Sequence, residues 1–154
     1  MRDVVPVARS IQAIRYAEIH MKYFEQKRNW KTNVKWFYGA TGTGKSHEAF
    51  RLAGEDAHEC MDTSKWWEGY DGHETVIIDD MRTNFCSFSN LLRLLDKYPF
   101  RVECKGGSRQ FLAKTIYITT TKHPREMYDH WEGEDVEQLL RRIDEIREFT
   151  EKYI

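Results

Sequence analysis

The order of apolar and polar residues predicts an α/β fold in which buried strands alternate with helices. Apolar side chains recur at three- and four-residue steps through 7–27, which is typical of an amphipathic helix. Bulky, strand-prone residues then fill 34–38. The apolar runs 75–78 and 113–120 are short and continuous, as in parallel strands that are covered on both faces.

The chain therefore divides into an N-terminal helical segment, residues 1–30, and a core domain, residues 31–154. In the simplest interpretation the first helix packs on its own domain. Because it precedes the core, a contact between subunits is the alternative.

Weaker patterns complete the predicted element order with a helix over 46–53, a short strand over 58–61, and helices over 87–98 and 134–143. Gly54 ends the first of these helices. Ser87 or Ser89 caps the next one, and Pro99 ends it.

The run VKWFYGATGTGKS, residues 34–46, carries the strongest chemical signal, because it fits G-x-x-x-x-G-K-[ST] after a strand and before a helix. Glycines let backbone N–H groups face inward, and the positive end of the helix completes a phosphate cradle. Lys45 can reach the β- and γ-phosphates, and the Ser46 hydroxyl can ligate Mg²⁺. The predicted cradle comprises Gly39, Ala40, Thr41, Gly42, Thr43, Gly44, Lys45, Ser46 and His47.

Two acids, Asp79 and Asp80, end the buried strand 75–78. A nucleotide cradle needs carboxylates at that place, so Asp79 is expected to hold Mg²⁺, directly or through water. Asp80 is expected to orient or deprotonate the attacking water. The central hypothesis is that a triphosphate with its Mg²⁺ lies between the glycine-rich loop and these two aspartates, which requires Asp79 to lie near Ser46.

Alternation through 100–105 and a return over 108–112 predict a β-hairpin with the glycine pair 106–107 as its turn. Lys105 then lies at the tip, with Arg109 close by. Such a tip can touch a phosphate backbone. A local basic island surrounds it, in which only Glu103 opposes Lys97, Arg101, Lys105, Arg109 and Lys114. The island is either a nucleic-acid contact or a solvated face.

Composition narrows the function classes. Of the 154 residues, 32% are charged and 40% hydrophobic, and the net charge of −1 predicts no partner by itself. No apolar run approaches the roughly 18 residues of a membrane span, so no membrane contact is expected. Three scattered cysteines indicate free thiols in a reducing compartment, and the histidines lack the spacing of metal ligands.

The linker before the acidic strand is unusually aromatic, with Trp66, Trp67 and Tyr70 close together. Structural anchoring is the simpler interpretation of this cluster. Stacking on a nucleic-acid base is the alternative.

Four blocks, in this order, resemble the superfamily-3 helicase domain of a replication-initiator (Rep) protein from a circular single-stranded DNA virus of circovirus type. They are GATGTGKS as Walker A, KWWEGYDGHETVIIDD ending in Walker B, LLRLLDKYPFRVECKGG as the hairpin motif, and IYITTTKHP as motif C. The resemblance runs from about Lys27 to Phe149 and covers most of the chain.

The resemblance implies a P-loop NTPase of the AAA+-like, additional-strand type. Its central parallel sheet has five strands, with the motif C strand between those of Walker A and Walker B. Helices flank the sheet, and a β-hairpin is inserted before the motif C strand. An edge strand near 145–150 is also implied, where the pattern alone is ambiguous between a helix and a strand.

The resemblance further implies an ATP-dependent DNA helicase of rolling-circle replication that uses ATP and Mg²⁺ and acts in the nucleus of a host cell. Family members form hexameric rings, share ATP sites between subunits and grip single-stranded DNA. Lys105 looks like the gripping lysine. Arg142, with Arg141 as the alternative, resembles the arginine finger that reaches a neighbour's γ-phosphate.

Two departures from the family pattern stand out. Motif C usually ends in Asn where this chain has Thr121, so Thr120 or a water is expected to share its sensor role. The family's N-terminal nicking nuclease has no matching motif, so we expect an excised domain to which Met1 was added, without nicking activity.

Two other functions compete with the motor. A P-loop small-molecule kinase would use the same cradle, but the hairpin and the acid pair argue against it. A nucleotide-gated assembly or packaging ATPase without unwinding needs the same site as the helicase.

Overall fold

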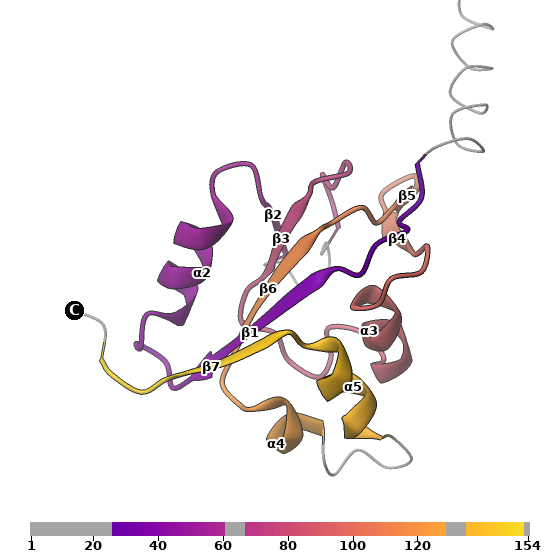
Figure 1. The fold of residues 1–154 in the computed structure, drawn as a ribbon. Coiled ribbons are helices and arrows are strands. Elements are labelled where there is room, and N and C mark those ends of the chain that lie inside the picture. The colour runs from indigo at the N-terminus through magenta and orange to yellow at the C-terminus, as the bar shows by residue number, and fades with distance from the viewer. Residues whose placement is uncertain (1–25, 61–66, 129–134, 153–154) are drawn as a thin grey trace, which may run out of the picture.

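Five parallel strands form a central sheet in the order β2-β3-β6-β1-β7 (Figure 1). Their bounds are His58–Cys60 for β2, Thr75–Ile78 for β3, Thr115–Thr120 for β6, Asn33–Gly39 for β1 and Glu145–Phe149 for β7. The motif C strand, β6, lies between β1 and β3, which carry the Walker motifs. The predicted additional-strand sheet and its final edge strand are therefore confirmed.

This computed structural model describes residues 26–60, 67–128 and 135–152. The helix predicted over 7–27 lies almost entirely outside the described residues, so the helix and its role between subunits stay predictions. Among the helices that are described, none has the length and apolar character to cross a membrane.

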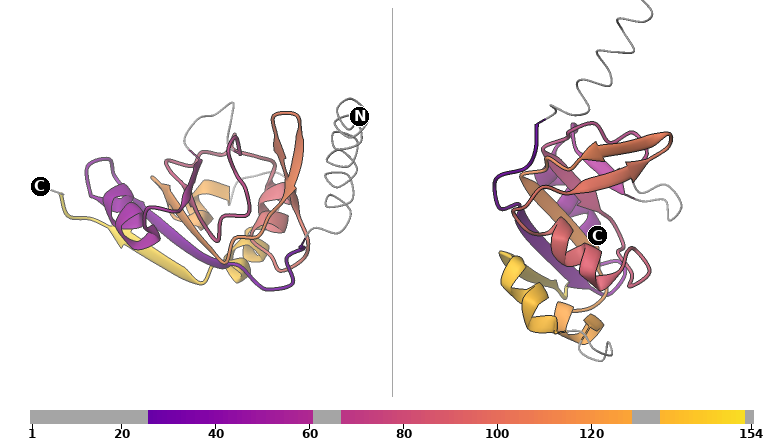
Figure 2. Two further views of the ribbon diagram at one scale, coloured as in Figure 1. Left: turned by 90° about the horizontal axis from the view of Figure 1, so that it is seen from above. Right: turned by 90° about the vertical axis from the view of Figure 1, so that its right-hand side faces the viewer.

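Both faces of the sheet are covered, which explains the continuous apolar runs in the central strands. Trp36 and Ile78 face the larger apolar cluster, whereas their neighbours Phe37 and Ile77 face a smaller one. Helix α2, Lys45–Ala53, packs on the smaller cluster through Ala49. The opposite face is covered by α3 (Phe88–Leu94), α4 (Pro124–Tyr128) and α5 (Val136–Arg142), as Figures 1 and 2 show.

Local signals set most helix ends where they were predicted. The Ser87 hydroxyl accepts the Asn90 N–H at 3.1 Å, so Ser87 rather than Ser89 caps α3. Gly54 closes α2 by donating its N–H to the Phe50 carbonyl at 3.2 Å. Helix α3 ends at Leu94, earlier than the predicted stop before proline, and α4 was not predicted.

The predicted β-hairpin is confirmed, but its turn was placed one residue too late. Strand β4, Arg101–Cys104, pairs antiparallel with β5, Gly107–Gln110. Because Cys104 pairs with Gly107, the turn consists of Lys105 and Gly106. Gly106 supplies the left-handed conformation, with φ of 83°, that the second turn position requires. Lys105 is therefore part of the turn itself.

The side chain of Arg28 ties the segment before β1 to the end of α3. Its guanidinium is 1% exposed and donates to the carbonyls of Arg93, Leu94 and Tyr98 at 2.8, 2.6 and 2.9 Å. It also lies 5.2 Å from the centre of the Phe111 ring. Burial lowers the pKa of Arg28 to about 10, so the group stays charged at neutral pH and satisfies the free carbonyls of the helix end.

We expect Arg28→Met to lower the free energy of unfolding by roughly 3 kcal/mol, because the apolar stem remains while buried carbonyls lose their donor. Urea denaturation followed by tryptophan fluorescence measures the change. Arg125→Met is the matched control: Arg125 pairs with Glu137 where both side chains are at least half exposed, so its loss should cost under about 1 kcal/mol. Equal losses in the two variants would contradict the structural role of Arg28.

Candidate nucleotide-binding site

The carboxyl ends of β1, β3 and β6 meet at one edge of the sheet, next to the beginning of α2 (Figure 1). Ligands of open α/β sheets bind at this edge. A cavity of about 430 Å³ opens there. It is lined by Thr41, Gly42, Gly44, Lys45, Ser46, His47, Asp79, Asp80, Arg82 and Thr119.

Glycines shape the loop between β1 and α2. A Cβ on Gly39 would lie 2.2 Å from the carbonyl oxygen of Phe149, so only glycine allows β7 to pack against the beginning of the loop. Gly42 and Gly44 adopt left-handed φ values of 88° and 82°. The loop therefore leads directly into α2, whose free N–H groups begin at Lys45.

Lys45 is held inside this loop. Its side chain is largely buried, and its ammonium group donates to the Ala40 carbonyl at 3.2 Å. The Thr43 hydroxyl donates to the same carbonyl at 2.7 Å. The lysine charge is thus directed across the loop, where a phosphate chain would lie.

Ser46 and Asp79 lie together, as the central hypothesis requires, whereas their roles toward Mg²⁺ stay predictions. The Ser46 hydroxyl donates to Asp79 Oδ1 at 2.6 Å. Thr119 Oγ1 donates to the same oxygen at 2.8 Å. Hydroxyl and carboxylate oxygens are the donors that Mg²⁺ prefers, so the residues present fit this ion. The described residues contain no group of three or more His, Cys, Asp or Glu side chains that could hold a metal, so the fit of this site rests on the Asp79 carboxylate and the Ser46 hydroxyl.

Asp80 adopts an unusual backbone conformation at the same place. Its φ is 55°, and its N–H donates to Thr119 Oγ1 at 2.7 Å. The next residue, Met81, donates its N–H to the Thr119 carbonyl at 2.8 Å. These bonds turn the chain as it leaves β3, and the Asp80 carboxylate pairs with Arg82 at 2.8 Å. Left-handed non-glycine residues concentrate at functional sites.

Thr119 and Arg82 are residues of this site that the sequence analysis missed. Expectations for motif C centred on Thr121, which is partly exposed and does not line the cavity. Thr120 is buried and donates its hydroxyl to the Met81 carbonyl at 2.7 Å. The sequence did contain a signal for Thr119. Its hydroxyl follows the bulky residues Ile116–Ile118 in a buried strand, and a buried polar side chain needs a hydrogen-bond partner.

The other predicted site residues lie far from the cavity. Lys105 and Arg109 are exposed on the hairpin, at the opposite end of the sheet in Figures 1 and 2. Arg142, on the last turn of α5, pairs with Asp96 at 3.0 Å. Its neighbour Arg141 is exposed.

The aromatic linker residues serve as packing in the described part. Trp67 stacks on His58 at 5.6 Å and meets Tyr70 and Phe111 edge-on. The Tyr70 hydroxyl accepts the Leu112 N–H at 2.8 Å and donates to the His73 carbonyl at 3.0 Å. Trp66 lies outside the described residues.

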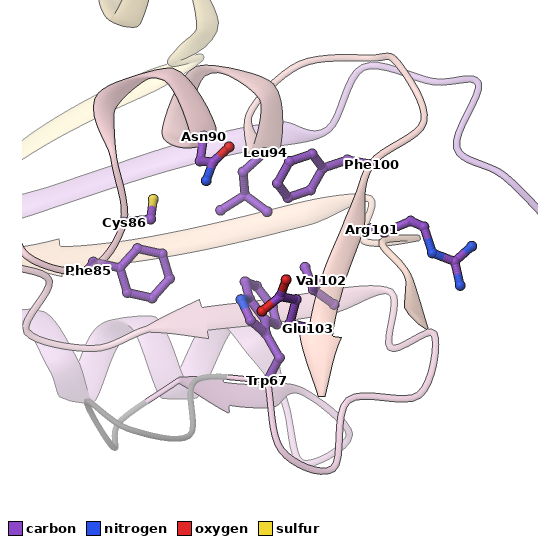
Figure 3. A pocket seen from close by; sticks show the side chains of 9 residues that line it. All are labelled: Trp67, Phe85, Cys86, Asn90, Leu94, Phe100, Arg101, Val102 and Glu103. Atoms are coloured by element: carbon purple, nitrogen blue, oxygen red, sulfur yellow. The ribbon is translucent and has the colours of Figure 1, made fainter. Parts of the chain in front are cut away.

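Trp67 also borders a second cavity, of about 330 Å³, between α3 and the hairpin (Figure 3). Phe85 and Cys86 form its wall on the Walker B side, and Phe100 forms part of the opposite wall. Burial raises the pKa of the Cys86 thiol to about 12, so this thiol is not a nucleophile at neutral pH. Like Cys86, the two other cysteines are free.

The sheet order, the glycine-rich loop and the contact between Ser46 and Asp79 define a P-loop NTPase with an additional central strand. A family model described as RNA helicase matches residues 35–122. The chain belongs to this RNA helicase family, as a superfamily-3 helicase domain, and is therefore an ATPase of the helicase class.

Viral replication proteins are similar to this chain. It is 45% identical to the replication-associated protein of Porcine circovirus 2, over 77% of this chain and 38% of that protein. It is 41% identical to the replication-associated protein of Goose circovirus, over 79% of this chain and 40% of that protein. The chain thus spans about two fifths of the length of these relatives.

Among solved structures, the S. cerevisiae Hsp104–ADP complex matches with a TM-score of 0.43 and 16% identity, over 92% of this chain and 33% of that chain. A similarity of this size is too weak to support an argument about function.

We expect Thr119→Val to reduce ATP turnover by roughly 10- to 100-fold, because outer partners of a metal-binding carboxylate have effects of this size. The substitution keeps the shape but removes bonds to Asp79 and to the Asp80 N–H. Thr119→Ser restores the hydroxyl and should retain most of the activity. The measurement is the Mg²⁺ concentration that gives half-maximal turnover, which should rise only in the valine variant. If the Mg²⁺ concentration for half-maximal turnover is unchanged in Thr119→Val, Thr119 does not contribute to Mg²⁺ binding.

Proposed function

We propose that this chain is the motor domain of a viral DNA helicase, which uses ATP hydrolysis to move along single-stranded DNA and separate a duplex. The observation that carries the proposal is the joint position of Lys45, Ser46 and Asp79 in one cavity at the edge of the sheet. Family membership and the exposed basic hairpin support it.

The cavity residues divide the chemistry among themselves. Lys45 and the N–H groups at the beginning of α2 bind the phosphate chain. Ser46 and Asp79 hold Mg²⁺, which supplies charge neutralisation at the transferring phosphate. Asp80 orients the attacking water, and its bent backbone directs the carboxylate into the cavity. Thr121 follows β6 directly and is proposed to sense the phosphate through water.

DNA contact is proposed for the hairpin tip. Other basic residues of the island are engaged locally: Arg101 donates to the Ser108 hydroxyl at 2.8 Å, and Lys114 pairs with Glu74 at 3.7 Å. Lys105 and Arg109 extend from the hairpin as exposed cations. An exposed lysine on a glycine turn can reach a phosphate at little steric cost.

We propose that the chain assembles into a hexameric ring, and the location of the arginines supports this proposal. Helix α5 directly precedes β7, so Arg141 and Arg142 lie at the amino end of the sheet, away from the cradle of their own subunit (Figure 1). If either arginine acts on a γ-phosphate, the nucleotide belongs to a neighbouring subunit. Arg142 remains the proposed finger and would have to leave Asp96, whereas the exposed Arg141 is the alternative.

The biological setting is proposed from the relatives. Similarity to replication-associated proteins of circoviruses supports a role in rolling-circle replication, in the nucleus of a host cell.

We expect Lys45→Ala to lose ATP turnover but not DNA binding, and Lys105→Ala to lose DNA affinity but not ATP turnover. The first should abolish ATP turnover, because the charge on the transferring phosphate is lost, and should keep DNA affinity. The second should keep basal turnover and lose roughly one unit of the slope of log affinity against log salt. Turnover assays and fluorescence anisotropy with a labelled single strand measure both. Normal turnover in Lys45→Ala would refute the ATPase site, and an unchanged salt slope in Lys105→Ala would refute the hairpin contact.

Mixing Arg142→Ala with Lys45→Ala subunits should recover activity that neither variant has alone. In a random ring of equal parts, about one quarter of the interfaces join an intact Lys45 to an intact Arg142. ATP turnover across a series of mixing ratios measures the recovery, and the same series with Arg141→Ala identifies which arginine acts. Absence of recovery at every ratio with both variants would exclude sites shared between subunits and favour a kinase.

A further inference from the structure

Arg82 shares the nucleotide cavity with the predicted catalytic residues, although no motif includes it. Its side chain lines the cavity together with Lys45, Ser46 and Asp79. Its guanidinium lies 2.8 Å from Asp80 Oδ1. A cation is thus paired with the carboxylate that is proposed to orient the attacking water.

The backbone of Arg82 is held on both sides. Met81 before it is fully buried, and its carbonyl accepts the Thr120 hydroxyl at 2.7 Å. The Arg82 carbonyl itself accepts the Phe85 N–H at 3.0 Å in a tight turn. Because the backbone is anchored, the guanidinium can move only by rotation of its own side chain, within the cavity and its opening.

The contact with Asp80 is of a kind that breaks readily. The side chains of Arg82 and Asp80 are 54% and 61% exposed, and exposed ion pairs contribute little free energy. A triphosphate carries more negative charge than one carboxylate, and a guanidinium binds phosphate oxygens through two parallel hydrogen bonds. A contact of the Arg82 guanidinium with a phosphate is therefore more favourable than its contact with the Asp80 carboxylate.

We propose that Arg82 is a nucleotide-binding residue that holds Asp80 in the free protein and transfers to the terminal phosphate when ATP binds. The transfer frees the Asp80 carboxylate to accept a hydrogen bond from water only when a terminal phosphate is present. Arg82 thereby discriminates ATP from ADP, and its transfer favours the released form of Asp80 when ATP is bound. This inference rests on the proposed ATPase function.

The first test is binding, independent of turnover. Fluorescence competition should measure the affinities of a non-hydrolysable ATP analogue and of ADP. Arg82→Gln should weaken binding of the analogue by about tenfold, the effect of one hydrogen bond to a charged group. ADP binding should change by less than about twofold, because ADP lacks the terminal phosphate. Arg82→Lys keeps the charge without the paired hydrogen bonds and should lie between. Arg125→Gln is the control on an exposed ion pair outside the cavity.

A double-mutant cycle tests the exchange itself. Asp80→Asn releases Arg82, so it should tighten binding of the analogue more in the wild-type background than in the Arg82→Gln background. The expected coupling is about two- to fivefold, the range measured for exposed ion pairs. Additive effects, or equal losses for the analogue and ADP in Arg82→Gln, would overturn the inference.

Lys45→Ala separates this failure from failure of the proposed function. If Lys45→Ala loses affinity for both nucleotides while Arg82→Gln behaves like Arg125→Gln, the cavity binds ATP and only the role of Arg82 is wrong. If Lys45→Ala binds both nucleotides normally, the proposed ATPase site is wrong as well.

Discussion

The contact of the Ser46 hydroxyl with the Asp79 carboxylate depends on the register of three parallel strands. Ile78 pairs with Ile118 across β3 and β6, so Asp79 and Thr119 emerge side by side. Phe37 pairs with Thr119 across β1 and β6, which brings the beginning of the glycine loop to the same level. A slip of one residue in β6 would send the Thr119 hydroxyl to the opposite face and remove the bond that holds Asp79. The apolar residues buried on both faces of the sheet resist such a slip.

Much of this arrangement could be predicted from the sequence, because its determinants are local. Each of three local patterns specifies one element. The glycine spacing specifies the loop before α2, the buried run before Asp79 specifies β3, and the repeated leucines specify α3. Contacts between elements could not be read in this way. Thr119 and Thr120 are neighbours on β6 that point to opposite faces of the sheet, so the parity of the strand, set by pairing with β1 and β3, decides that the Thr119 hydroxyl reaches Asp79. Thr121 lies beyond the end of the strand. The position of the hairpin turn was predicted wrongly for a related reason. Two adjacent glycines are compatible with more than one pairing register of β4 and β5, and only the pairing itself decides between them.

The segment from Asp79 to Cys86 connects the nucleotide cavity with the cavity between α3 and the hairpin. Asp79, Asp80 and Arg82 line the nucleotide cavity, and Phe85 and Cys86 line the cavity beneath the hairpin (Figure 3). The bond from the Phe85 N–H to the Arg82 carbonyl makes the segment a compact turn, so one short stretch of backbone positions side chains in both cavities.

The charges of the nucleotide cavity leave a bound triphosphate only partly neutralised. Among the described lining residues, Lys45 and Arg82 are formally positive and Asp79 and Asp80 negative, so their charges cancel. A triphosphate with one Mg²⁺ still carries net negative charge, and hydrolysis concentrates it on the terminal phosphate and the leaving oxygen. The beginning of α2 offsets part of this charge through its N–H groups. Arg141 and Arg142 lie at the end of the sheet remote from the cradle of the same chain. In the proposed ring, an arginine from a neighbouring subunit would supply the cation that the cavity lacks.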